Sequence, residues 1–176
     1  MDVQFVQFDK GKPFYEMVGT FLCILSASPA IFNSGNPMGF QKDQYISLQG
    51  VQVSSKHWHP IEVYEQAQNG HMTQGFFIGH SCMMLANLAY ESVKHLNDYS
   101  PEFEFFRHVR NAASHSNLFT FNQDEPRRPV AWKGVIIDHN RKGTSNPLHG
   151  IHCFGPVLGP ADIIDLLSDI EQKIAT

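Results

Sequence analysis

Apolar residues recur at helical spacing in several stretches of the chain. The clearest stretch runs from Phe76 to Leu96, with apolar side chains at Ile78, Cys82, Leu85, Ala89, Val93 and Leu96. Steps of three and four residues predict an amphipathic helix that packs one face on the core. We expect this helix to form the spine of the fold.

Three further patterns predict shorter helices. The first begins after Pro13 and ends near Pro29, with apolar residues at Phe14, Val18, Phe21 and Leu25. A brief helix over Ile61–Gln68 follows Pro60, and Asn69-Gly70 is expected to end it. The last begins at Gly159-Pro160 and carries an apolar stripe at Ile163, Leu166, Leu167, Ile170 and Ile174.

A second long helix is predicted from Pro101 to about Ser116. Ser100 is suited to cap its N-terminus, Pro101 to occupy the first helical position, and Glu102 and Glu104 to face the positive end of the helix dipole. At about 100° per residue, one side of this helix is apolar. That side holds Phe105, Phe106, Val109, Ala112 and Ala113, and the other holds Arg107, His108, Asn111, Ser114 and His115.

Strand signals are weak and local. The segments Val130–Ile137 and Gly150–Phe154 are rich in β-branched and aromatic residues and flank a polar turn at Asn140–Asn146, which predicts a small hairpin. Residues Asn33–Pro60 have no sustained hydrophobic period, which predicts a loop with at most a short strand. The fold class that these patterns favour is mainly α, a helical bundle with a small β-hairpin.

Composition supports one compact domain over residues 1–176. The chain has 42% hydrophobic and 17% charged residues, enough apolar surface to build a core. Its net charge of −4 argues against a protein that coats nucleic acid through a broad basic surface, but leaves a local basic site open. Cys23, Cys82 and Cys153 lie apart in apolar stretches, which indicates reduced core thiols and a cytoplasmic protein.

No membrane segment or secretory signal is expected. Residues Phe14–Phe32 contain Glu16, Pro29 and several hydroxyl side chains, so they fall short of the roughly 20 apolar residues that a span needs. The chain begins Met-Asp-Val-Gln and lacks the basic region of a signal peptide.

The polar side of the Pro101 helix carries groups that bind phosphate and move protons. Cleavage of RNA through its own 2′-hydroxyl needs a base, an acid and a cation for the charge on the phosphorus oxygens. Histidine can serve as base or acid near neutral pH, and arginine holds two phosphate oxygens through its planar fork. Arg110 and His115 supply these groups, and Asn111 lies one turn before His115. The scheme requires no metal ion or cofactor.

The run Arg110-Asn111-Ala-Ala-Ser-His115 resembles the R-polar-x-x-x-H signature of the HEPN superfamily. The resemblance covers about Phe76 to Phe119 and implies a helical bundle that acts as a metal-independent endoribonuclease in toxin–antitoxin systems or phage defence. It also implies a homodimer in which two motif helices form one composite site, with an antitoxin or defence protein as a further partner. Arg110 would contact phosphate, Asn111 would support it, and His115 would act in proton transfer or positioning.

Other residues are candidate RNA contacts. Arg107, His108 and Asn117 lie beside the motif, and Trp132-Lys133 could stack a base and hold a phosphate. Alternatives stay open: Trp132 can equally pack on the bundle, Arg107 and His108 can simply face solvent, and an inactive HEPN-like domain would bind RNA or protein without cutting. His57 and His59 lack an acidic or cysteine neighbour, so no metal site is predicted there.

Overall fold

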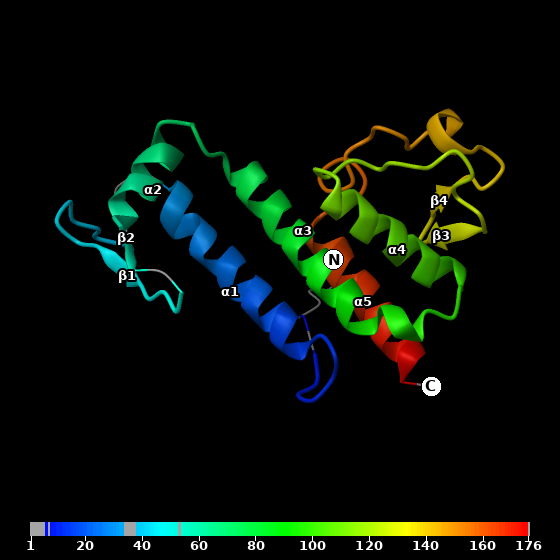
Figure 1. The fold of residues 1–176 in the computed structure, drawn as a ribbon, viewed down its shortest axis with the longest axis horizontal. Coiled ribbons are helices and arrows are strands. Elements are labelled where there is room, and N and C mark those ends of the chain that lie inside the picture. The colour runs from blue at the N-terminus through cyan, green and yellow to red at the C-terminus, as the bar shows by residue number, and fades with distance from the viewer. Residues whose placement is uncertain (1–5, 7, 34–37, 53, 176) are drawn as a thin grey trace, which may run out of the picture. The chain divides into compact units, whose positions relative to one another are not determined.

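The computed structural model describes residues 6, 8–33, 38–52 and 54–175 and is mainly α-helical (Figure 1). Its helices are α1 Tyr15–Phe32, α2 Pro60–Gln68, α3 Gln74–Val93, α4 Pro101–Ser114 and α5 Pro160–Ile174, with 3₁₀ turns at Lys94–Leu96 and Gly143–Ser145. Two antiparallel hairpins pair β1 Ile46–Leu48 with β2 Lys56–Trp58, and β3 Val130–Trp132 with β4 Val135–Ile137. The prediction of a mainly helical chain with a small hairpin is confirmed, whereas an HEPN-like bundle stays a prediction.

The chain divides into two compact units whose boundaries fall inside helices α1 and α3. One unit comprises Met1–Leu22 and Gly79–Thr176, and the other comprises Cys23–Ile78. Helices α4 and α5 and the hairpin β3–β4 belong to the first unit, and the hairpin β1–β2 and helix α2 belong to the second. The expectation of a single domain stays a prediction.

Helix α4 is covered on two sides within the first unit, where it lies between α3 and the hairpin β3–β4 (Figure 1). Toward α3, the ring of Phe106 meets that of Tyr90 with centroids 5.3 Å apart. Toward the hairpin, the Phe105 ring stacks on Trp132 with centroids 5.9 Å apart. Because two elements cover α4, more of its surface is buried than a single apolar stripe would require.

The start of α4 follows the prediction, and its end comes slightly earlier. The backbone N–H of Phe103 donates to Ser100 Oγ at 3.4 Å, so Ser100 caps the helix as expected. The helix ends at Ser114 rather than near Ser116, because Ser116 and Asn117 adopt positive φ angles of 56° and 68°. Left-handed residues stop a helix, and they leave His115 as its C-terminal cap.

The apolar stripes of α3 and α5 are largely confirmed. Cys82, Leu85, Ala89 and Val93 are buried on α3, and Ile163, Leu166, Leu167 and Ile170 are buried on α5. Leu96 is exposed because it lies beyond the end of α3, in the 3₁₀ turn. Of the three thiols, Cys82 and Cys153 are buried as predicted, whereas Cys23 is exposed.

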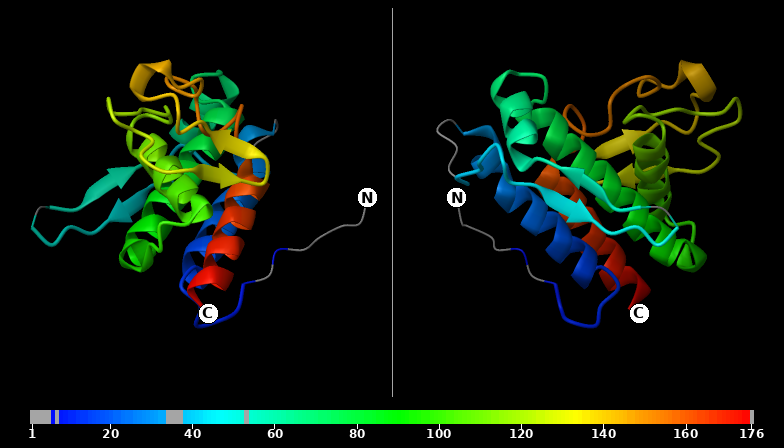
Figure 2. Two further views of the ribbon diagram at one scale, coloured as in Figure 1. Left: turned by 90° about the vertical axis from the view of Figure 1, so that its right-hand side faces the viewer. Right: turned by 60° about the vertical axis from the view of Figure 1, so that its left-hand side comes forward.

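The hairpin β3–β4 forms inside Val130–Ile137, which corrects the predicted pairing with Gly150–Phe154. Val130 pairs with Ile137 and Trp132 with Val135, around a two-residue turn at Lys133 and Gly134. Both turn residues have positive φ, 41° and 85°, the backbone of the tight turns that suit twisted hairpins. The hairpin lies across α4 and α5 (Figure 2).

Residues Gly150–Phe154 instead pair with the segment that follows α4. The N–H of Phe119 donates to Ile151 O at 2.9 Å, and the N–H of Gly150 donates to Phe119 O at 2.8 Å. The N–H of Cys153 donates to Asn117 O at 2.7 Å. These bonds fix the chain just after His115 without forming a regular strand.

Helix α1 continues past Pro29, where the prediction ended it. Pro29 lies in the last turn, so its missing N–H and its ring disturb only the helix end. By length and composition α1 is able to cross a membrane, a test that core helices of soluble proteins and N-terminal leaders also pass. The absence of a membrane span and the cytoplasmic location stay predictions, and the residues Met-Asp-Val-Gln lie outside the part that the structure describes.

Polar and aromatic contacts between distant segments hold the second unit together. The side chain of Gln68 donates to Ile31 O at 3.2 Å, and the Phe32 and Phe77 rings lie 5.6 Å apart. The segment predicted as a loop with a short strand forms the hairpin β1–β2, all of whose strand residues are exposed. His57 and His59 both contact the ring of Tyr45.

Candidate functional site

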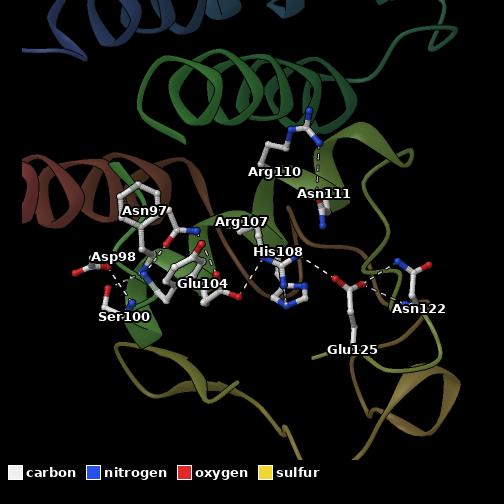
Figure 3. A network of polar contacts seen from close by, with 12 residues as sticks. Asn97, Asp98, Ser100, Glu104, Arg107, His108, Arg110, Asn111, Asn122 and Glu125 are labelled. Carbon is white, nitrogen blue, oxygen red and sulfur yellow. Dashed lines mark hydrogen bonds and ion pairs between the residues drawn. The ribbon is translucent and has the colours of Figure 1, made fainter. Parts of the chain in front are cut away.

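The motif residues lie at the C-terminal end of α4. Arg110 and Asn111 lie in its last turns and are half-buried, whereas His115 caps the helix and is exposed. Arg110 Nη1 donates to Asn111 Oδ1 at 3.4 Å, so the structure brings these two side chains together (Figure 3). The backbone of His115 is no longer helical, with φ −113° and ψ 52°. Its side chain is therefore not bound to the 100° spacing of helical residues.

The guanidinium of Arg110 is paired with an acid on α3. Arg110 Nη2 donates to Glu91 Oε1 at 2.6 Å, and the guanidinium carbon lies 5.9 Å from the centre of the Tyr90 ring. Arg110 Nε is buried and finds no hydrogen-bond partner among the described residues. Hydrogen bonds from Lys94 and Arg110 lower the pKa of the Glu91 carboxyl, so this group is ionised near neutral pH.

A second polar contact joins the end of α4 to α3. Ser114 Oγ donates to Asn87 Oδ1 at 2.6 Å, and Asn87 Nδ2 donates to Met83 O at 3.1 Å. Together with the pair of Arg110 and Glu91, this contact fixes the last turns of α4 against α3. The backbone that carries the motif is therefore held by side chains one turn apart on both helices.

Arg107, in the middle of α4, is the centre of a network with the buried carboxylates of Glu104 and Glu125 (Figure 3). Its Nε donates to Glu104 Oε2 at 3.1 Å, and its Nη1 donates to Glu125 Oε1 at 3.0 Å. Burial alone would lower the pKa of Arg107, but the two carboxylates outweigh it and raise that pKa. Arg107 is thus a permanent cation that links α4 to the loop holding Glu125.

His108 is buried, which corrects its prediction as an RNA contact. Its side chain is 1% exposed, against the Phe121 ring at 5.2 Å. Burial, aided by the charge of Arg107, lowers the pKa of His108 to about 4, so the ring is neutral near pH 7. Because Arg107 Nη2 lies 2.9 Å from Nε2 and can only donate, Nε2 accepts and the buried Nδ1 carries the proton.

Trp132 is also buried, which corrects its prediction as a base-stacking residue. Its Nε1 donates to Asp169 Oδ2 at 2.8 Å, and its ring is covered by Phe105. Lys133 is exposed but pairs with Asp165 at 3.0 Å and Asp169 at 3.6 Å. The alternative in which Trp132 packs on the bundle therefore describes this pair better.

Asn117 serves the backbone rather than a ligand. Its Oδ1 accepts from Phe154 N at 2.7 Å, and its Nδ2 donates to Phe154 O at 2.9 Å. Both the oxygen and the nitrogen of the amide bond the backbone of Phe154, so Asn117 has a structural role here, and its contact with RNA stays a prediction.

Several residues of these networks escaped the sequence analysis. Glu91, Glu104 and Glu125 were not singled out as partners, although Glu104 and Arg107 have the spacing of a helical ion pair. Glu91 and Glu125 come from other segments, and nothing local marks them. In the described ranges, no group of three or more His, Cys, Asp or Glu residues is placed to hold a metal ion.

Comparison with protein-family models, with curated proteins and with solved structures finds no match to this chain. The resemblance to the HEPN superfamily therefore rests on the residues Arg110, Asn111 and His115 and stays a prediction.

Proposed function

We propose that this protein is a metal-independent endoribonuclease of the toxin or phage-defence type. Its composite site would form where two copies of α4 meet in a homodimer. The observation that carries the proposal is the placement of a guanidinium, an amide and an imidazole at one helix end: Arg110 contacts Asn111, and His115 caps the same helix in an exposed position.

Each group has a role in cleavage through the 2′-hydroxyl. Arg110 would hold the phosphate oxygens, whose negative charge grows in the transition state. His115 would transfer a proton, and the His115 of a second copy would provide the opposite transfer, since a two-fold axis doubles each group. Asn111 would orient the guanidinium through the 3.4 Å contact.

A binding role without cleavage is the second candidate, and one observation favours it. The charge of Arg110 is already met by Glu91 at 2.6 Å, so the phosphate has to compete with a carboxylate of the same chain. An inactive HEPN-like module that binds RNA or a protein partner would tolerate that arrangement.

The test is incubation of purified protein with total RNA in EDTA. Arg110→Ala and His115→Ala are compared with wild type and with two matched controls, Arg141→Ala and His95→Ala, which replace exposed residues outside the motif. We expect RNA loss with wild type and both controls, and intact RNA with the two motif variants at equal helical content by circular dichroism. Intact RNA with wild type, or cleavage by all five proteins, would overturn the proposal.

A further inference from the structure

A cavity of about 410 Å³ lies beside the first half of α4, away from the motif. It is lined by Asn97 and Tyr99 from the loop before α4, by Glu104 and Arg107 from α4, and by residues of the loop that holds Glu125. Its volume is in the range of pockets that take small molecules. The lining mixes buried carboxylates with arginines, so the cavity suits a ligand that carries both hydrogen-bond donors and negative charge.

Glu104 presents two neighbouring acceptors. Its Oε1 accepts from Asn97 Nδ2 at 3.2 Å, and its Oε2 accepts from Arg107 Nε at 3.1 Å. A carboxylate has about four acceptor positions, so one remains on each oxygen of Glu104. Glu125 differs, because its Oε2 already accepts from both the backbone and the side chain of Asn122.

A flat stacking surface forms another wall of the cavity. The guanidinium carbon of Arg128 lies 3.9 Å from the centre of the Tyr99 ring, and both side chains line the cavity. Both residues are exposed. Aromatic rings and arginine planes are the surfaces on which unpaired bases stack in nucleic-acid recognition.

Two arginines at this loop are available for an anion. Arg127 pairs with Asp124 at 2.6 Å, but both side chains are more than half exposed, so the pair contributes little and a ligand can replace it. Arg128 has no carboxylate partner within 4.0 Å in the portion of the chain that is described. Arginine forks hold phosphate oxygens through paired hydrogen bonds.

We propose that this cavity binds a guanine nucleotide. The base stacks on the outer face of the Arg128 guanidinium, whose other face lies on the Tyr99 ring. Its ring N–H and amino group donate to the two oxygens of Glu104, and its phosphate pairs with Arg127. Guanine is the base whose Watson–Crick edge places two donors side by side, which matches a carboxylate. Adenine offers a ring acceptor at the same place, and that acceptor would face a carboxylate oxygen.

The nucleotide can be free or can be one guanosine of an RNA strand, and this second source rests on the proposed ribonuclease function. In that case the cavity would set a preference for guanosine near the cleaved bond. The recognition chemistry at Glu104 is the same for both sources, so binding can be measured separately from cleavage.

Titration calorimetry with GMP and AMP tests the proposal. We compare wild type, Glu104→Gln, Tyr99→Asn and, as a control, Glu102→Gln, which changes a carboxylate of the same helix outside the cavity lining. Asparagine suits position 99 because Tyr99 has a positive φ of 61°. Wild type and Glu102→Gln should bind GMP about tenfold more tightly than AMP, as a paired-donor contact predicts.

In Glu104→Gln the preference for GMP should disappear, and Tyr99→Asn should weaken both nucleotides. No binding of GMP by wild type, or equal binding of GMP and AMP, would overturn the proposal. So would an unchanged preference in Glu104→Gln. If Glu104→Gln does not fold, the wild-type preference and the Tyr99→Asn result decide the question.

The source is identified with the oligonucleotides UUGUU and UUAUU, bound to the His115→Ala variant so that cleavage cannot interfere. Binding of UUGUU that is tighter than that of both GMP and UUAUU assigns the cavity to RNA, and binding of UUGUU that is weaker than that of GMP assigns it to a free nucleotide. Either result keeps the guanine site, and GMP binding stands even if the wild-type protein proves unable to cut RNA.

Discussion

The Nη2 atom of Arg110 lies 2.6 Å from the Oε1 atom of Glu91, so the motif arginine of α4 carries a counter-ion from α3. The side chain of Arg110 is 32% exposed and that of Glu91 is 41% exposed. An ion pair with this exposure stabilises the fold only slightly. In the proposed site, a phosphate replaces Glu91 as the partner of Arg110. Glu91 thereby becomes a competitor of the substrate.

Glu91→Gln is therefore expected to strengthen RNA binding. Removal of the competing charge should lower the KM for a short RNA by about two- to fivefold and leave kcat nearly unchanged. Steady-state cleavage of a fluorescent oligonucleotide measures both constants, with Glu102→Gln as the charge-matched control. A higher KM, or loss of cleavage, would mean that Glu91 positions Arg110 and does not compete with the phosphate.

Arg107 is expected to be needed for stability. Arg107→Met leaves the buried carboxylates of Glu104 and Glu125 without their cation, which should cost about 3–5 kcal/mol of unfolding free energy. Urea denaturation followed by circular dichroism measures the loss. Arg127→Met, which removes an exposed pair, should cost less than about 1 kcal/mol. Equal effects of the two substitutions would contradict the buried network.

The stability of the protein should decrease as the pH falls below the pKa of an unperturbed histidine. His108 has a pKa of about 4 in the folded protein against 6.5 in the unfolded chain, so the unfolded state takes up its proton first. Unfolding then becomes easier by about 2 kcal/mol between pH 7 and pH 5. The carboxyl of Glu125, whose pKa is lowered, adds its own loss only below this window.

The check is urea denaturation at both pH values for wild type and His108→Phe. The variant keeps a ring beside Phe121 and lacks the titrating group, so its stability should change little over the same window. A similar fall in both proteins would assign the pH dependence to other groups.

Trp132 should matter to folding and not to RNA. Trp132→Phe removes the 2.8 Å hydrogen bond to the Asp169 carboxylate, which should cost about 1.5–3 kcal/mol of stability. RNA affinity, measured by filter binding with the folded variant, should stay unchanged. A severalfold loss of affinity at unchanged stability would restore Trp132 as a base-stacking residue.

The helices were predictable because their signals are local. The Ser100 cap, Pro101 and the apolar residues of α4 lie within one segment of sequence, and the structure uses them as the pattern indicates. The apolar stripes of α3 and α5 follow the same rule. The early end of α4 depends on the left-handed conformation of Ser116 and Asn117, which their residue types permit but do not require.

The burial of polar residues could not be predicted in this way. Periodicity places His108 and Glu104 away from the apolar stripe of α4, yet both are buried. His108 lies against the Phe121 ring, and the Glu104 carboxylate is bonded by Asn97 and Arg107. The same is true of Trp132, whose partner Asp169 lies on α5. The sequence of one helix does not determine which distant segment packs on each of its faces, because that depends on the tertiary fold.

Cleavage through the 2′-hydroxyl leaves product ends that no other route leaves. A defined oligoribonucleotide is incubated in EDTA with wild type, Arg110→Ala or His115→Ala, and the masses of the products are measured by mass spectrometry. We predict upstream fragments that end in a 2′,3′-cyclic phosphate, formed by wild type alone. Fragments with free 3′-hydroxyl ends, or equal cleavage by the His115→Ala variant, would rule out cleavage through the 2′-hydroxyl by His115.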